Sequence, residues 1–158
     1  MRLKDKTAII TGGARGIGGA IAEGYAREGA KVCVADIEFE VAQETAARIG
    51  NGAYAFKLDV TKMDSIKACV AEAEKRFGGI DILVNGAAVF DMQPYGQITE
   101  KSYDFVFNVN VKGLLFMLQE VGESMKRRGK GGKIINFASQ AGRRGEPLVA
   151  VYCATKAA

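Results

Sequence analysis

Residues 7–18 read TAIITGGARGIG, and this stretch decides the fold. Its first five residues form an apolar run typical of a buried strand, and Gly16 to Glu28 predicts a helix directly after it. Glycines 12, 16 and 18 fall at the turn between the two, where the backbone bends sharply. The free N–H groups at the start of such a helix suit a pyrophosphate. Gly12, Arg15, Gly16, Ile17 and Gly18 are therefore candidate cofactor-binding residues, although many glycine-rich turns only connect elements.

The rest of the chain repeats the alternation of apolar runs and amphipathic segments. Helices are predicted over 38–49, over 61–77 with Thr61 as N-cap, and over 100–127 with Thr99 as N-cap. Continuous apolar strands between helices indicate a parallel sheet covered on both faces. With right-handed crossovers, this gives a Rossmann-type, doubly wound α/β fold in a single domain over 1–158. The further strands are predicted at 31–36, 53–58, 81–84 and 133–137.

Composition indicates a globular, cytoplasmic protein. The chain has 158 residues, 48% hydrophobic and 25% charged, and no apolar run of the roughly 20 residues that span a bilayer. The charged start, Met1 to Lys6, does not resemble a signal peptide. The net charge is +4, and its densest cluster, 126–130, is interpreted as a solvated helix end. No nucleic-acid module or membrane segment is found, so neither is an expected partner.

The residue inventory narrows the chemistry. The chain has no histidine, which excludes Ser-His-Asp hydrolysis and most metal sites. Its three cysteines, Cys33, Cys69 and Cys153, are widely spaced and odd in number, so neither a disulfide framework nor a zinc site is expected. Any acid–base catalysis must use Tyr, Lys, Cys, Asp or Glu.

The end of the second predicted strand indicates which dinucleotide binds. Asp36 stands about 20 residues after the glycine turn, where a carboxylate accepts hydrogen bonds from the adenosine ribose. Its charge would repel a 2′-phosphate, so Asp36 favours NAD over NADP. Arg15 argues the other way, because a guanidinium in the turn could meet that phosphate. Asp36 is given more weight because it stands where the phosphate would be; its alternative interpretation is a helix cap.

A second group of polar residues indicates proton transfer. Tyr152 and Lys156 lie one helical turn apart on one face. A phenol with an ordinary pKa near 10 is a poor base at neutral pH, and a neighbouring ammonium lowers that pKa. Ser139 follows the fifth predicted strand at its carboxyl end, where open α/β sheets bind ligands. Asn110 lies on an apolar helix face and is interpreted as either part of the site or a structural, helix-kinking residue.

Together these residues resemble the short-chain dehydrogenase/reductase family over the whole chain. The spacing of Tyr152 and Lys156, and the interval from Ser139 to Tyr152, both fit that family. The set is specific even though no single member is. The pattern is matched at Gly12, Gly16, Gly18, Asp59, Asn85, Asn110, Ser139, Tyr152 and Lys156.

The resemblance implies a role for each catalytic position. Tyr152 would be the general acid/base, and Lys156 would lower its pKa and bind the nicotinamide ribose. Ser139 would orient the reacting oxygen, and Asn110 would hold a water that extends the proton relay.

It also implies roles on the cofactor side. Asp59 would bind the adenine amino group with Val60 beside it, and Asn85 would lie near the cofactor and brace the central strands. One departure is visible, because the family usually reads Asn-Asn-Ala-Gly where this chain reads Asn85-Gly86-Ala87-Ala88. Gly86 puts local hydrogen bonding in doubt, but not the chemistry.

Within the family, residues 137–146 and 151–156 are most similar to bacterial sorbitol (polyol) dehydrogenases. The resemblance implies NAD-dependent oxidation of a secondary alcohol of a hexitol to the ketose. Gln140 and Glu146 would then bind sugar hydroxyls, unless they are simply solvated loop residues. The main alternative is a 3-oxoacyl-carrier reductase, which would usually prefer NADP, against Asp36.

The chain ends two residues after Lys156, before the further strands and the substrate-covering loop of this family. We therefore expect the N-terminal portion of a longer enzyme, inactive alone and a homotetramer when complete. The alternative is a short, non-catalytic protein that binds a nucleotide.

Overall fold

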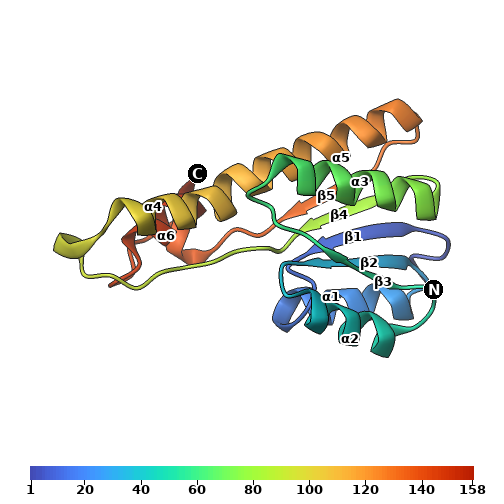
Figure 1. Ribbon diagram of the computed structural model, residues 1–158, viewed down its shortest axis with the longest axis horizontal. Coiled ribbons are helices and arrows are strands. Elements are labelled where there is room, and N and C mark those ends of the chain that lie inside the picture. The colour runs from blue at the N-terminus through green and yellow to red at the C-terminus, as the bar shows by residue number, and fades with distance from the viewer.

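The computed structural model describes residues 1–158 as a five-stranded parallel sheet with helices on both faces (Figure 1). The strand order is β3-β2-β1-β4-β5, so the order reverses between β1 and β4. In such a sheet, ligands bind beyond the carboxyl ends of the strands at this switch point. The strands are β1 (Thr7–Thr11), β2 (Lys31–Asp36), β3 (Tyr54–Lys57), β4 (Ile82–Asn85) and β5 (Lys133–Asn136).

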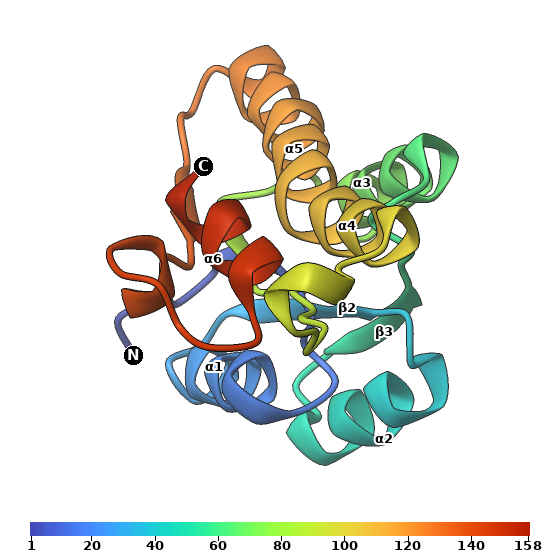
Figure 2. The same cartoon turned by 90° about the vertical axis from the view of Figure 1, so that its left-hand side faces the viewer.

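The helices form two layers. Figure 1 places α1 and α2 on one face, and α3 and α5 on the other. In Figure 2, α4 and α6 lie nearest the viewer, on the side toward which the strands end. None of the helices has both the length and the apolar character needed to cross a bilayer. The helices are α1 (Gly16–Arg27), α2 (Phe39–Ile49), α3 (Met63–Phe77), α4 (Glu100–Phe107), α5 (Leu114–Arg128) and α6 (Ala150–Ala157).

The sheet separates two hydrophobic clusters, which explains the continuous apolar runs of the sequence. Ile9 and Leu83 belong to the cluster beneath α3 and α5, together with Met117. Ile10 and Val84, the next residue on each strand, belong to the cluster beneath α1 and α2. Successive side chains of a strand point to opposite faces, so a strand covered on both faces is apolar throughout.

The strand β5 is an exception to the prediction that every strand is covered on both faces. Three of its four residues are exposed, and Ile135 keeps 39% of its surface accessible. It pairs only with β4, at one edge of the sheet. The prediction was wrong here because an apolar run does not show whether a helix packs over it.

The structure confirms one predicted helix cap and corrects the other. The Thr99 hydroxyl oxygen accepts from the backbone N–H of Ser102 at 3.2 Å, so Thr99 caps α4 as expected. Thr61 does not cap α3, which begins at Met63. Its hydroxyl instead donates to Asp59 Oδ1 at 2.7 Å, and its backbone N–H donates to the same oxygen at 2.9 Å, so Thr61 belongs to the turn before the helix.

The single helix predicted over 100–127 is interrupted. Residues Asn108–Gly113 form a π-helical segment, η2, between α4 and α5. A π segment widens the turn by one residue, and such segments are frequent at functional sites. Two short 3₁₀ turns complete the fold, η1 (Tyr95–Gln97) and η3 (Gln140–Gly142).

Candidate functional site

A cleft of about 550 Å³ opens at the carboxyl ends of β1 to β4. Its walls come from the turns after these four strands, and Phe105 and Val109 close one side of it. The predicted residues Gly12, Arg15 and Asp36 all line it. The cleft thus lies at the switch point of the sheet, where a dinucleotide is expected.

The glycine turn is built for close approach by a ligand. Gly12 and Gly16 have φ values of +65° and +57°, a region that side-chain-bearing residues rarely adopt. A Cβ at Gly12 would lie 2.8 Å from the backbone nitrogen of Ala87, whereas one at Gly16 would meet nothing within 4 Å. A Cβ at Gly18 would collide with the carbonyl oxygen of Gly12. Gly12 and Gly18 therefore allow the turn to close, and Gly16 leaves open space before α1.

The first turn of α1 has room for an anion. Its N-cap residue, Arg15, makes no side-chain hydrogen bond to the helix, and no acidic residue occupies the first turn. Uncapped N–H groups and the positive end of the helix dipole suit a phosphate. The turn suits the pyrophosphate of a nicotinamide dinucleotide, and Ile17 is exposed beside it.

Asp36 holds the turn from the end of β2. Its Oδ2 accepts from the backbone N–H of Ala14, and its Oδ1 accepts from that of Glu38, both at 3.0 Å. A carboxylate has about four acceptor sites, so two remain for ribose hydroxyls. Asp36 is not itself the N-cap residue of α2, which is Glu38, but its Oδ1 accepts from the backbone N–H of that residue.

Asp59 and Val60 lie where the resemblance implied, in the wall of the cleft after β3. Asp59 Oδ1 accepts from both the N–H and the hydroxyl of Thr61. Val60 is buried and packs closely against Gly113 of the π segment, since a Cβ there would lie 2.8 Å from Val60 Cγ2. This wall of the cleft is therefore packed against the π segment between α4 and α5.

Asn85 joins β4 to the edge strand β5. Its Nδ2 donates to Asn136 Oδ1 at 2.9 Å, at the level where β4 and β5 end together. Its own Oδ1 is buried without a partner. The residue itself lies behind the main cleft, whose wall is formed by the next residues, Gly86 and Ala87.

The departure at Gly86 has a local explanation. The Gly86 N–H donates to both the carbonyl and the hydroxyl oxygen of Thr11, each at 3.1 Å. A Cβ at this position would lie 2.6 Å from the Thr11 carbonyl oxygen. In this chain, glycine lets the turn after β4 close against the end of β1.

Tyr152 and Lys156 are brought together on α6. Lys156 Nζ lies 5.7 Å from the centroid of the Tyr152 ring and donates to the carbonyl oxygen of Phe137 at 3.0 Å. Burial lowers the pKa of Lys156 below its usual range. The Tyr152 ring packs edge-on against Phe90, with the ring centroids 6.2 Å apart. A phenol beside a fixed ammonium is suited to proton transfer.

Ser139 stands at the start of η3, the turn that packs against α6. Its hydroxyl oxygen accepts from the N–H of Ala141 at 3.1 Å, at the start of η3. The turn η3 packs against α6 so tightly that a Cβ at Gly142 would lie 2.6 Å from the carbonyl carbon of Lys156. The fold therefore joins Ser139 to the helix that carries Tyr152.

Asn110 is buried in the π segment and links three parts of the chain. Its Oδ1 accepts from the N–H of Val89, and its Nδ2 donates to the Val89 carbonyl, both at 2.8 Å. Nδ2 also donates to the Thr155 hydroxyl at 3.1 Å. These bonds attach α6 and the loop at Val89 to the π segment, which is a structural role for the amide.

The two predicted substrate residues, Gln140 and Glu146, both lie against Arg144 and not in the cleft. Glu146 Oε1 accepts from Arg144 Nε at 3.2 Å, and the Gln140 amide lies beside the same guanidinium. Gln140 is exposed, and neither residue lines the cleft. Both remain on the loop between Ser139 and Tyr152, near the proton-transfer pair in sequence.

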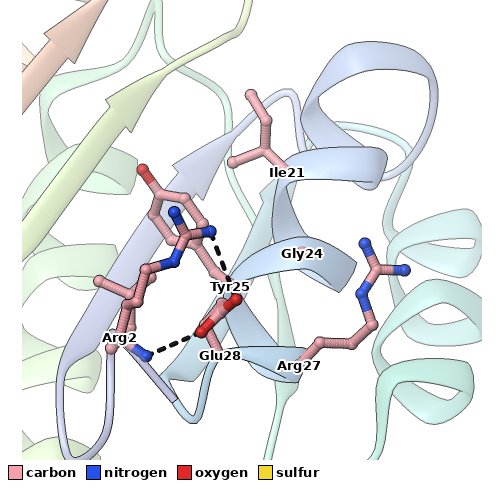
Figure 3. Close-up of a pocket in the computed structure, with 7 residues that line it drawn as sticks. Arg2, Ile21, Gly24, Tyr25, Arg27 and Glu28 are labelled. Atoms are coloured by element: carbon pink, nitrogen blue, oxygen red, sulfur yellow. Dashed lines mark hydrogen bonds and ion pairs between the residues drawn. The ribbon is translucent and has the colours of Figure 1, made fainter.

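A second hollow, of about 520 Å³, lies on α1 and the N-terminus, and it contains none of the predicted site residues (Figure 3). Figure 3 shows Arg2 bound to Glu28, with Tyr25 beside them. The Arg2 backbone N–H donates to Glu28 Oε2 at 2.7 Å, and its guanidinium donates to Oε1 at 3.3 Å. These bonds attach the N-terminus to α1 and offer no catalytic chemistry.

Three residues that the sequence analysis missed contribute to the site. Thr155 donates its hydroxyl to the Tyr152 carbonyl at 2.8 Å and accepts from Asn110. Phe90 packs on Tyr152, and Glu38 pairs with Arg15. A threonine inside a helix, an aromatic in a loop and an acid at a helix start are all ordinary, so no sequence signal singled them out.

The chain is similar to known proteins along its length. Residues 6–158 match the family described as short chain dehydrogenase. The chain is 63% identical to a sorbitol dehydrogenase of Cereibacter sphaeroides and 58% identical to a galactitol 2-dehydrogenase of Agrobacterium fabrum, in each case over 158 residues. Each match covers all of this chain but only 62% of the length of the relative.

A solved structure agrees with the fold. It is a short-chain type dehydrogenase/reductase from Mycobacterium marinum, with a TM-score of 0.93 and 33% identity. The match covers 98% of this chain and 63% of that one. Sequence and fold agree, and the chain belongs to the short chain dehydrogenase family.

Proposed function

We propose that the complete protein is an NAD-dependent polyol dehydrogenase, which oxidises a secondary alcohol of a sorbitol-like hexitol to the ketose. The observation that carries the proposal is the Tyr152–Lys156 pair on a helix that packs against η3, the turn that follows Ser139. Phe90, which packs on Tyr152, directly follows the cleft residue Val89. The relatives named for sorbitol and galactitol support the substrate class, since both compounds are hexitols.

The cofactor side of the proposal rests on the fit of the cleft. Gly12, Gly16 and Gly18 would admit the pyrophosphate, and Asp36 would bind the adenosine ribose. Asp59, Val60 and Asn85 keep the supporting roles implied by the resemblance. When bound, NAD supplies the hydride acceptor, and the protein's task is to orient the alcohol and take its proton.

Tyr152 is the proposed general base for oxidation. Its phenolate oxygen would accept the hydroxyl proton of the alcohol and return it in the reverse direction. The Lys156 ammonium lies beside the Tyr152 ring, and its bond to the Phe137 carbonyl holds it in place. Ser139 would donate a hydrogen bond to the reacting oxygen, while Asn110 fixes α6 and would support the proton relay.

The polyol itself would lie on the Ser139 side of Tyr152. Gln140 and Glu146 are proposed to bind its remaining hydroxyls, which requires that Arg144 release them. Phe90 would form an apolar wall there, because it is 62% exposed and in contact with the Tyr152 ring.

We also propose assembly as a homotetramer. The outer face of α4 and α5 carries exposed apolar side chains, with Tyr103 48% and Leu115 52% accessible. Such a patch is typical of a subunit contact. Light scattering on the full-length protein tests this.

The test of the function is turnover by the full-length protein, followed as NADH absorbance. Sorbitol or galactitol with NAD should give robust rates, and NADP should not replace NAD. Turnover of an acetoacetyl thioester with NADPH, and not of hexitols, would assign the protein to 3-oxoacyl reduction instead. Nucleotide binding without either reaction would contradict a catalytic role.

A further inference from the structure

The adenosine end of the cleft carries an unequal set of charges. Among its lining residues, Asp36, Glu38 and Asp59 are acidic, and Arg15 is the single cation. Asp36 is engaged with backbone N–H groups, so its charge is fixed in position. A second phosphate on the ribose would enter a region in which Arg15 alone can offset repulsion.

Arg15 is already paired. Its Nη2 lies 2.7 Å from Glu38 Oε2, so the turn after β1 is joined to the start of α2 across the mouth of the cleft. Both side chains are more than half exposed, at 61% and 51%. Exposed ion pairs contribute little to stability, so the pair is better explained by what it does to the ligand.

We propose that Glu38 is a specificity-determining residue, which excludes 2′-phosphorylated dinucleotides by holding the Arg15 guanidinium away from the ribose 2′-position. This rests on the proposed use of NAD. To bind a 2′-phosphate, Arg15 would have to leave Glu38, and the freed carboxylate would remain beside the incoming dianion. Asp36 supplies repulsion, and Glu38 removes the one group able to counter it.

The expected change in affinity for a 2′-phosphorylated nucleotide follows from the electrostatics of charges near a surface. Neutralising Glu38 both frees Arg15 and removes one like charge from the lining of the cleft. At surface dielectric, these effects correspond to about tenfold in affinity, and they shrink as salt rises.

The test uses the adenosine half of the cofactor, so that catalysis is not required. Adenosine 5′-monophosphate and adenosine 2′,5′-bisphosphate are titrated calorimetrically into the full-length protein and into Glu38→Gln. The matched control is Glu40→Gln, which removes the same charge from an exposed residue of α2 outside the cleft. The double variant Arg15→Gln with Glu38→Gln tests whether the gain passes through Arg15.

We expect Glu38→Gln to bind the bisphosphate about tenfold more tightly, with monophosphate binding changed by less than about twofold. The gain should be absent in Glu40→Gln and in the double variant. An equal gain in Glu40→Gln, or no gain in Glu38→Gln, overturns the inference while leaving NAD binding intact. Failure of the unaltered protein to bind either nucleotide overturns both the inference and the proposed function.

Discussion

The nucleotide end and the catalytic corner are built differently. All five residues of β1 are buried, and the turn after it is locked by close backbone contacts and by Asp36. In α6 only Thr155 is buried, and the neighbouring β5 is largely exposed. The first region is shaped by packing; the second is held by a few polar bonds. Cofactor binding and proton transfer should therefore respond to different kinds of mutation.

The variant Tyr152→Phe should separate catalysis from cofactor binding most clearly. Removing the hydroxyl eliminates the proposed acid/base, which should lower kcat/KM for hexitol oxidation about 10³-fold. Binding of adenosine 5′-monophosphate should not change, since Tyr152 does not line the cleft. Steady-state rates and calorimetry on the full-length protein check both. Retained activity would remove Tyr152 from the mechanism.

The packing side of the comparison is tested by isoleucines on two strands. Ile9→Ala on β1 creates a cavity in a fully buried cluster and should lower the free energy of unfolding by about 3 kcal/mol. Ile135→Ala on β5 should cost less than about 0.5 kcal/mol in this 158-residue chain, because the side chain is partly exposed. Urea denaturation of both variants gives the values. Equal losses would mean that β5 is covered in solution.

The polar side is tested by Asn110→Ala. It leaves the N–H and carbonyl of Val89 unpaired and should destabilise the chain by about 1–3 kcal/mol. Amide exchange should accelerate in α6 more than in β1, because α6 loses the hydrogen bond that Asn110 donates to Thr155. Thr155→Val removes the bond between Asn110 and Thr155 but keeps the bonds to Val89, so amide exchange should accelerate less, and in α6 alone. Equal acceleration of amide exchange in α6 and β1 would argue against a local role for Asn110.

The smallest effect concerns pH. Burial lowers the pKa of Lys156, so its ammonium is lost at a lower pH than that of an exposed lysine near 10.4. Between the two values the unfolded chain binds the extra proton, so this group's contribution to stability rises with pH. Loss of the charge beside Tyr152 should make hexitol oxidation decline within the same window. Lys156→Arg should move that decline to higher pH, because arginine stays protonated. An unchanged pH profile would separate Lys156 from proton transfer.

The same contrast explains what could be predicted from sequence. Residues 7–11 and 31–36 were predicted with the observed bounds, because periodicity and glycine spacing report backbone geometry directly. Gly12, Arg15 and Asp36 followed from the glycine turn and the strand after it, whereas Asp59 and Val60 came from the family resemblance alone. The cleft residues Phe105 and Val109 were not predicted. The links that hold α6 were not predicted either, because Asn110, Val89 and Thr155 meet only after the chain has folded. The π segment was missed for a related reason: an extra residue in a helix turn leaves the apolar pattern nearly unchanged.

That extra residue makes the segment between α4 and α5 sensitive to length in a way that its composition is not. A wide turn of this kind takes up one extra residue while the helices on either side keep nearly the same orientation. Deleting one residue from 108–113 would let an ordinary turn form, and Phe105 would stay at the cleft. Asn110 lies within the segment itself, so the deletion would redirect its amide and break its bonds to Val89. A single-codon deletion here would therefore loosen the catalytic corner while leaving the cofactor wall in place.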